Sequence, residues 1–101
     1  AMPTSSSAQD IDRWFEQYAQ EYGIDVNILQ KIAVCESGYN ADAANGPYGG
    51  MFQFHYSTWS TTRSQMGLDN NPDLRFNGEE AIRTAAWKVS HEGVSAWPNC
   101  Q

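Results

Sequence analysis

Apolar residues recur at three- and four-residue spacing along much of the chain, which is typical of helices with one buried face. The first such stretch is predicted to begin after Asp10 as its N-cap and to end at Gly23, a residue type favoured just beyond a helix C-terminus. Its apolar face consists of Ile11, Trp14, Phe15, Tyr18, Ala19 and Tyr22. A link of one or two residues then leads into a second helix, so the two helices are expected to pack at an angle.

The second helix is predicted to run over residues 26–37, with Asp25 as its cap. Glu36 follows Ile32 by four residues and Leu29 by seven, so helical geometry places it on or beside the buried face. A carboxylate there loses hydration and stands at the negative end of the helix dipole, and both effects raise its pKa. That face is expected to consist of Ile28, Leu29, Ile32 and Cys35.

Residues 38–56 show neither helical nor strand periodicity, and the glycines and prolines among them predict an ordered loop that can hold a short hairpin. Loops of this length in small domains are usually functional. A third helix is predicted to begin after Ser57 as its cap and to end at Gly67.

A connector over residues 68–76 is expected to hold one helical turn around Leu74. The fourth helix is predicted to begin after Asn77, which forms a capping pair with Glu80, and to end at Gly93. Together the four helices and the glycine-rich loop predict one mainly α domain over residues 10–101. Residues 1–9 contain no large apolar cluster, and we expect a disordered linker that includes an artificial Ala-Met remnant.

The chain has 101 residues and a net charge of −6, without a cluster of basic residues, so nucleic acid is not an expected partner. No apolar run approaches membrane-spanning length. Two cysteines, Cys35 and Cys100, and two scattered histidines do not make a zinc site, and neither a metal nor another cofactor is expected. The preferred interpretation is one disulfide and an oxidising compartment outside the cytoplasm, with two free thiols as the alternative.

Glu36 is the candidate general acid, although many glutamates in the last turn of a helix are simply solvated. Two-carboxylate glycosidases need a second acid, but each remaining candidate suits a structural role better. These roles are capping for Glu79 and Glu80, a helix end for Glu92 and a loop turn for Asp42. A mechanism with one carboxylate is therefore the more economical hypothesis.

The aromatic residues around the loop suit either a core or a sugar-binding groove. If the segment from Met51 to Phe54 is extended, Gln53 points away from its phenylalanine neighbours. Its amide could then bind an N-acetyl group or the acid. The candidate substrate-binding residues are Ser37, Asn40, Tyr48, Gln53 and Phe54.

These motifs also carry a resemblance to known families. CESGYN followed by GMFQFHYSTW resembles the lytic transglycosylase domains of the soluble, SLT-like class. The Cys before Glu-Ser-Gly, the Tyr-Gly-Gly and the closing Ala-Trp-Pro-Asn-Cys are similar to resuscitation-promoting factors, compact peptidoglycan-cleaving relatives from actinobacteria. The likeness covers about residues 10–101.

The resemblance implies a compact lysozyme-like fold in which Glu36 protonates the oxygen between N-acetylmuramic acid and N-acetylglucosamine. The same residue then acts as base while the muramyl 6-hydroxyl closes a 1,6-anhydro ring. By position, Gln53 matches a glycan-binding glutamine, Ser37 and Asn40 match polar residues beside the acid, and Cys35 and Cys100 match a disulfide pair. The implied partner is a peptidoglycan glycan strand, and the domain is expected to act as a monomer within a larger bacterial or phage protein.

Two departures leave the product type open. The longer transglycosylases carry an Ala-Tyr-Asn-x-Gly motif, and here no tyrosine follows Tyr56. Pro47 also stands where the first glycine of Gly-x-x-Gly-x-x-Gln is expected. Muramidase-type hydrolysis of the same bond and a non-catalytic peptidoglycan-binding module remain the alternatives. A third class is a secreted signalling or inhibitor protein stabilised by its disulfide, which would have no affinity for glycans.

Overall fold

The computed structural model describes residues 8–100, which form four α-helices, a three-stranded sheet and one 3-10 helix. The helices are α1 (Ala8–Tyr22), α2 (Val26–Ser37), α3 (Tyr56–Met66) and α4 (Gly78–Glu92). The strands are β1 (Ala44–Asn45), β2 (Tyr48–Gly49) and β3 (Phe54–His55), and η1 (Pro72–Phe76) links α3 to α4. This architecture confirms the predicted mainly helical fold, including the hairpin within the loop and the turn around Leu74. None of the helices in this part of the chain is long and apolar enough to cross a bilayer.

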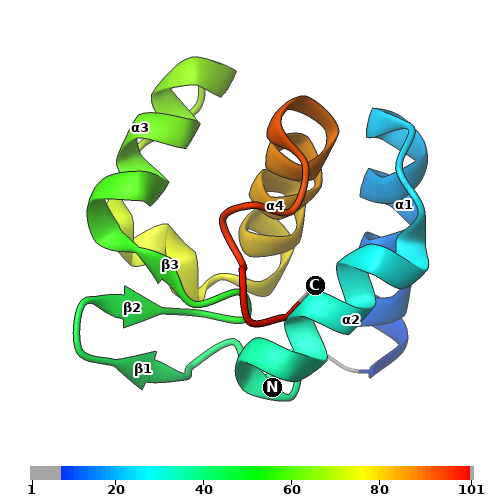
Figure 1. The fold of residues 1–101 in the computed structure, drawn as a ribbon, viewed down its shortest axis with the longest axis horizontal. Helices are drawn as coiled ribbons and strands as arrows, with labels where there is room; N and C mark the ends of the chain where they lie inside the picture. The colour runs from blue at the N-terminus through cyan, green and yellow to red at the C-terminus, as the bar shows by residue number, and fades with distance from the viewer. Residues whose placement is uncertain (1–7, 101) are drawn as a thin grey trace, which may run out of the picture.

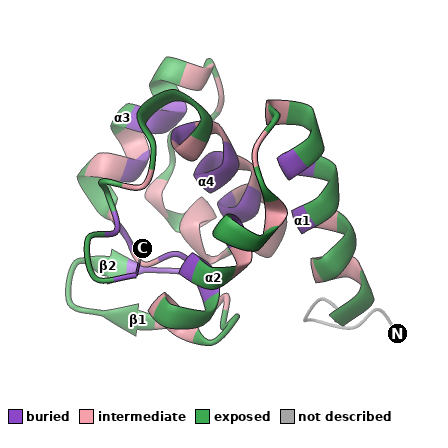
Figure 2. Ribbon diagram, turned by 45° about the vertical axis from the view of Figure 1, so that its right-hand side comes forward, coloured by how far each residue is buried: buried purple, intermediate pink, exposed green. Residues whose placement is uncertain are grey.

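Helix α4 lies between α3 on one side and α1 with α2 on the other (Figure 1). Its inward positions are mostly small, which lets the neighbouring helices approach and bury large side chains against it. In Figure 2 the buried positions of the helices face this centre, while exposed residues cover the outer faces. The largest apolar side chains of the core are Trp59, Tyr18, Phe15, Phe52, Leu29, Ile32, Met51 and Ile82.

The three short strands form an antiparallel sheet in the order β1-β2-β3, which lies below α3 in Figure 1. The sheet is held on η1, because the Arg75 guanidinium donates to the carbonyls of Pro47 (2.9 Å) and Phe54 (3.1 Å). Glycine is required at this contact, since a Cβ on Gly50 would overlap the carbonyl oxygen of Arg75. The Gly-Gly pair therefore lets the loop lie directly against the backbone of η1.

Helix α2 has the predicted N-cap, but its buried face differs in part from the predicted one. Asp25 caps it as predicted, accepting a 2.8 Å hydrogen bond from the Asn27 N–H. Ile28, however, is 43% exposed, and Cys35 is also on the exposed side despite its bond to Cys100. The buried positions are instead Leu29, Ile32 and Ala33, so the centre of the buried face is rotated toward Glu36.

Two predicted helix starts are wrong. Helix α1 begins at Ala8, so Asp10 is in its first turn, where it forms an ion pair of 2.8 Å with Arg13. Residues 8 and 9 of the linker expected over residues 1–9 are therefore helical, and residues 1–7 lie outside the described part of the chain. Helix α3 begins at Tyr56 and is capped by His55, whose Nδ1 accepts from the Ser57 N–H at 3.1 Å. An imidazole nitrogen can accept this bond as a serine hydroxyl does, which the sequence prediction overlooked.

Candidate active site

Glu36 lies in the last turn of α2, half-buried, on the side of the helix that carries Leu29 and Ile32. Burial raises the pKa of its carboxyl above the ordinary value for glutamate. No residue within 8–100 forms a hydrogen bond or an ion pair with this carboxylate. The acid therefore holds its proton to a higher pH than a solvated glutamate does, while part of its side chain remains exposed to solvent.

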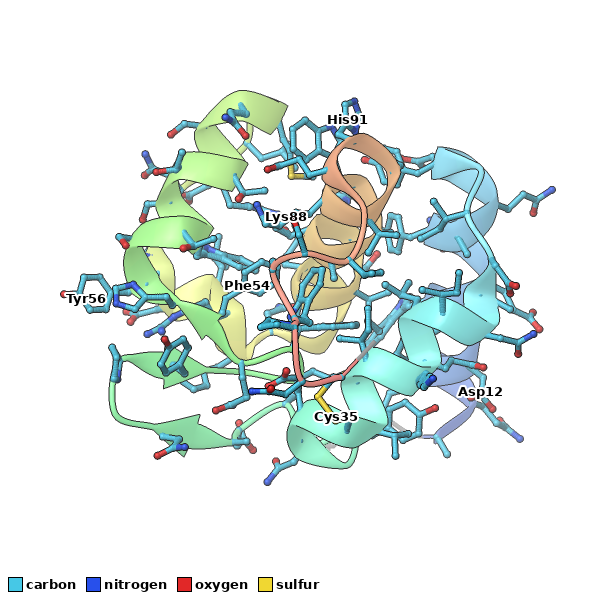
Figure 3. All side chains as sticks on the ribbon, viewed as in Figure 1. Asp12, Cys35, Phe54, Tyr56, Lys88 and His91 are labelled. Atoms are coloured by element: carbon cyan, nitrogen blue, oxygen red, sulfur yellow. A yellow bond between two sulfur atoms is a disulfide. The ribbon has the colours of Figure 1, made fainter. Side chains whose placement is uncertain are left out.

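The end of α2 is fixed on both sides of Glu36. Cys35 is bonded to Cys100, with the two Cα atoms 5.6 Å apart, and Figure 3 shows Cys35 beneath the C-terminal tail. The Ser37 hydroxyl donates to the Met51 carbonyl at 2.7 Å and accepts from the Asn40 N–H at 3.1 Å. The carboxylate is thus carried by a backbone that is tied to both the tail and the loop, which limits the positions it can take.

A groove of about 350 Å³ lies between the sheet, the start of α3 and the tail. Its tail side is held by Trp97, whose indole N–H donates to the Phe52 carbonyl at 2.9 Å. Trp97 and Cys100 belong to the same short tail, so one segment forms a wall of the groove and anchors the helix end that carries Glu36. The groove is lined by Tyr48, Gln53, Phe54, His55, Ser57, Thr58, Ala96 and Trp97.

Gln53 lines this groove, but in a different conformation from the one predicted. Its φ of 50° places it in the left-handed region, so the segment before β3 is a turn and the expectation of an extended Met51-to-Phe54 run is wrong. The side-chain amide nitrogen donates to the carbonyls of Ala43 (3.1 Å) and Gly50 (2.8 Å). The amide oxygen has no partner within residues 8–100 and is the atom that remains for a ligand.

The other predicted site residues are divided among three places. Tyr48 is 46% exposed at the groove, whereas Phe54 is 3% exposed and packs between Trp59 and Trp97 (ring centroids 5.1 and 5.7 Å). Ser37 belongs to the bonds that fix the end of α2. Asn40 accepts from the Asp42 N–H at 3.0 Å and lines a separate pocket of about 400 Å³ beside α1 and the start of α4, where Trp14 and Glu79 also lie.

The groove residues that sequence reasoning missed include His55, Thr58 and Trp97. Thr58 and His55 flank the start of α3. The sequence predicted Ser57 rather than His55 as the helix cap, so this arrangement was not expected. Trp97 was visible as a large aromatic side chain close to Cys100 in a short polar tail, which was the available signal. All three become candidates for ligand contact because they share the groove with Gln53.

The acids considered as a second carboxylate lie elsewhere, and none within residues 8–100 lines the groove. Glu79 accepts from the Tyr18 hydroxyl (2.5 Å), and Glu80 pairs with Arg63 (2.8 Å). The carboxylate of Glu92 pairs with the Lys88 ammonium at 3.1 Å. Among residues 8–100 no three histidine, cysteine or acidic side chains are grouped as metal ligands.

Comparisons with known proteins place this arrangement in a family. A family model, the transglycosylase-like domain, matches residues 24–100. The chain is similar to resuscitation-promoting factor RpfE of Mycobacterium tuberculosis, 37% identical over 71 residues that cover 68% of this chain and 38% of the relative, so it spans less than half of that protein's length. No solved structure gives a significant match. The residues that match the family model include Glu36, the groove and both cysteines. The chain therefore belongs to the transglycosylase-like domain family, as the sequence motifs predicted.

Proposed function

We propose that this domain cleaves the β-1,4 bond between N-acetylmuramic acid and N-acetylglucosamine in peptidoglycan, with Glu36 as its single catalytic carboxylate. The observation that carries the proposal is the half-buried Glu36 at a fixed helix end, with a raised pKa and no partner among residues 8–100. General acid catalysis needs a proton held near the working pH and free to reach the substrate. Membership of the transglycosylase-like family supports the same residue.

In the proposed reaction, the protonated Glu36 donates its proton to the glycosidic oxygen as the bond to the muramyl anomeric carbon breaks. The resulting carboxylate accepts the proton of the muramyl 6-hydroxyl as that oxygen bonds to the same carbon. The product is a 1,6-anhydromuramyl end, and Glu36 regains its starting protonation state without consuming water. The amide oxygen of Gln53 is proposed to accept from an N-acetyl N–H and so to position the sugar.

Neither Glu36 nor any other carboxylate of residues 8–100 is among the residues that line the groove, and we place Glu36 beside it through the Cys35–Cys100 bond to the tail. The lack of a second acid among the described lining residues favours transglycosylation over a two-acid hydrolysis. Muramidase-type hydrolysis remains the alternative product route, since water could attack the same carbon with Glu36 as base. A non-catalytic peptidoglycan-binding module is the rival in which Glu36 has no role. We further propose that the domain acts outside the cytoplasm, because its disulfide requires an oxidising compartment. The domain is also proposed to be a monomeric part of a larger protein.

Digestion of purified sacculi followed by mass spectrometry tests the proposal. Wild-type protein should release fragments with anhydromuramyl ends, and Glu36→Gln should release none. Glu92→Gln is the matched control, because it neutralises an exposed glutamate at the end of another helix. Fragments with reducing ends would show that the bond is hydrolysed rather than closed to a 1,6-anhydro ring. Absence of any fragment between about pH 4 and 8 would overturn the enzymatic proposal.

A further inference from the structure

The groove continues onto an exposed row of aromatic rings formed by Tyr48, His55 and Tyr56, here named the aromatic strip. Tyr48 and His55 are cross-strand partners in β2 and β3, with ring centroids 5.4 Å apart and planes at 82°. The His55 ring lies 4.4 Å from that of Tyr56 with planes at 32°. The three rings are therefore one connected surface.

The tyrosines of the strip are exposed and do not pack in the hydrophobic core. Tyr48 is 46% and Tyr56 51% exposed, two of the largest values among the big apolar side chains of residues 8–100. Figure 3 shows Tyr56 directed outward at the edge of the molecule, whereas Phe54 of the same segment points inward. Exposed aromatic groups that adjoin a binding groove indicate a ligand-contacting surface.

The central ring of the strip is also held in place before any ligand arrives. His55 Nδ1 accepts from the Ser57 N–H (3.1 Å) and lies 2.8 Å from the Ser57 hydroxyl, which fixes the imidazole in the centre of the strip. The sheet pairing places the backbone of Tyr48 opposite that of His55. A side chain whose rotamer is already restricted, as that of His55 is, loses little conformational entropy on binding.

We propose that the aromatic strip is an additional sugar subsite that binds the glycan strand beyond the groove, so that the domain favours long strands over short oligosaccharides. The inference rests on the proposed function for the identity of the strand. The inference is supported by the continuity of the strip with the groove, because Tyr48 and His55 line the groove and also belong to the strip. The strip residues are uncharged tyrosines around an imidazole, a surface that suits the apolar face of a pyranose ring rather than a charged peptide.

Binding of β-1,4-linked N-acetylglucosamine oligomers tests the strip, measured by calorimetry or NMR in a Glu36→Gln background so that no cleavage interferes. The hexamer should bind more tightly than the trimer. Tyr56→Ala should weaken hexamer binding about three- to tenfold and leave trimer binding unchanged, while Tyr56→Phe should keep the wild-type affinity. Ile28→Ala, which removes an exposed apolar side chain of α2 outside the strip and the groove, is the control and should change neither affinity.

Equal loss of trimer and hexamer affinity in Tyr56→Ala, or no loss of either, would overturn the strip proposal. Far-ultraviolet circular dichroism and thermal melting exclude misfolding of the variants as the cause. The two proposals fail separately. A protein that binds oligomers with this length dependence but never cleaves sacculi refutes the catalytic role, and one that cleaves but shows no length dependence refutes the strip.

Discussion

The disulfide between Cys35 and Cys100 joins the helix end that carries Glu36 to the tail that carries Trp97, across a sequence separation of 65 residues. The chain-entropy model credits a loop of that length with about 4 kcal/mol, because it restricts the unfolded chain. One covalent bond thus stabilises the fold and keeps the acid and the groove wall together.

Reduction of the disulfide should lower the free energy of unfolding by about 4 kcal/mol. Urea denaturation with and without reductant measures the change. The double variant Cys35→Ser, Cys100→Ser should show a similar loss and no further response to reductant. A wild-type protein whose stability is indifferent to reductant would contradict this account.

Much of the fold could be predicted because helix caps and apolar spacing are local signals. Asp25, Gly38 and Gly67 stand where the helices begin or end, and Asn77 accepts from the Glu80 N–H at 3.1 Å as predicted. The reciprocal half of that capping pair is not formed. Glu80 pairs with Arg63 instead, and such a contact between distant segments leaves no local pattern.

The site was harder to predict than the fold. The place of Glu36 beside the buried face of α2 could be predicted, since its spacing in the sequence from Ile32 and Leu29 determines its helix face. The conformation of Gln53 could not, because a positive φ is rare for a residue other than glycine and depends on the bonds its side chain makes with the loop. The groove wall at Trp97 likewise depends on tertiary packing of the tail.

The pH dependence of stability should report the raised pKa of Glu36. A folded-state pKa above the unfolded value means that the folded protein binds this proton more tightly. The resulting stabilisation is fully present below the unfolded pKa, about 4.3, and is lost as pH rises through the folded value. Glu36→Gln should therefore gain stability relative to wild type between about pH 4 and pH 7, measured by thermal melting across that range. A stability difference independent of pH would contradict the burial of this carboxyl.

Glu80→Gln should be far more damaging than Glu92→Gln. Arg63 is 3% exposed, and its guanidinium loses a charged partner when Glu80 is neutralised, at a cost of about 3 kcal/mol. Glu92 is 48% exposed, and its partner Lys88 is 10% exposed, so loss of this half-exposed pair should cost about 1 kcal/mol. Urea denaturation of the two variants compares these values, and equal losses would refute the importance of the Arg63 pair.

His55→Ala should destabilise the protein by about 1 kcal/mol, because it removes the side-chain acceptor at the start of α3. His55→Asn retains an oxygen acceptor and should recover most of the loss. Ser57→Ala should have a smaller effect, since Ser57 contributes its backbone N–H to the cap. Thermal denaturation of the three variants under one buffer condition makes the comparison. A larger loss of stability from Ser57→Ala would show that the Ser57 side chain is the cap of α3, as expected from the sequence.

Gly50→Ala should cost about 3 kcal/mol or more, whereas Gly46→Ala should cost about 1 kcal/mol. Both glycines have positive φ (86° and 59°), so both substitutions carry backbone strain. Only at Gly50 would the new methyl group meet the carbonyl of Arg75, while nothing lies within 4 Å of that position at Gly46.

Gly50 also provides a carbonyl to Gln53 (2.8 Å), so its displacement should weaken oligosaccharide binding as well as folding. Urea denaturation measures the stabilities and NMR titration the binding. Similar losses at the two glycines would show that the loop can move away from η1 and that the groove does not depend on this contact.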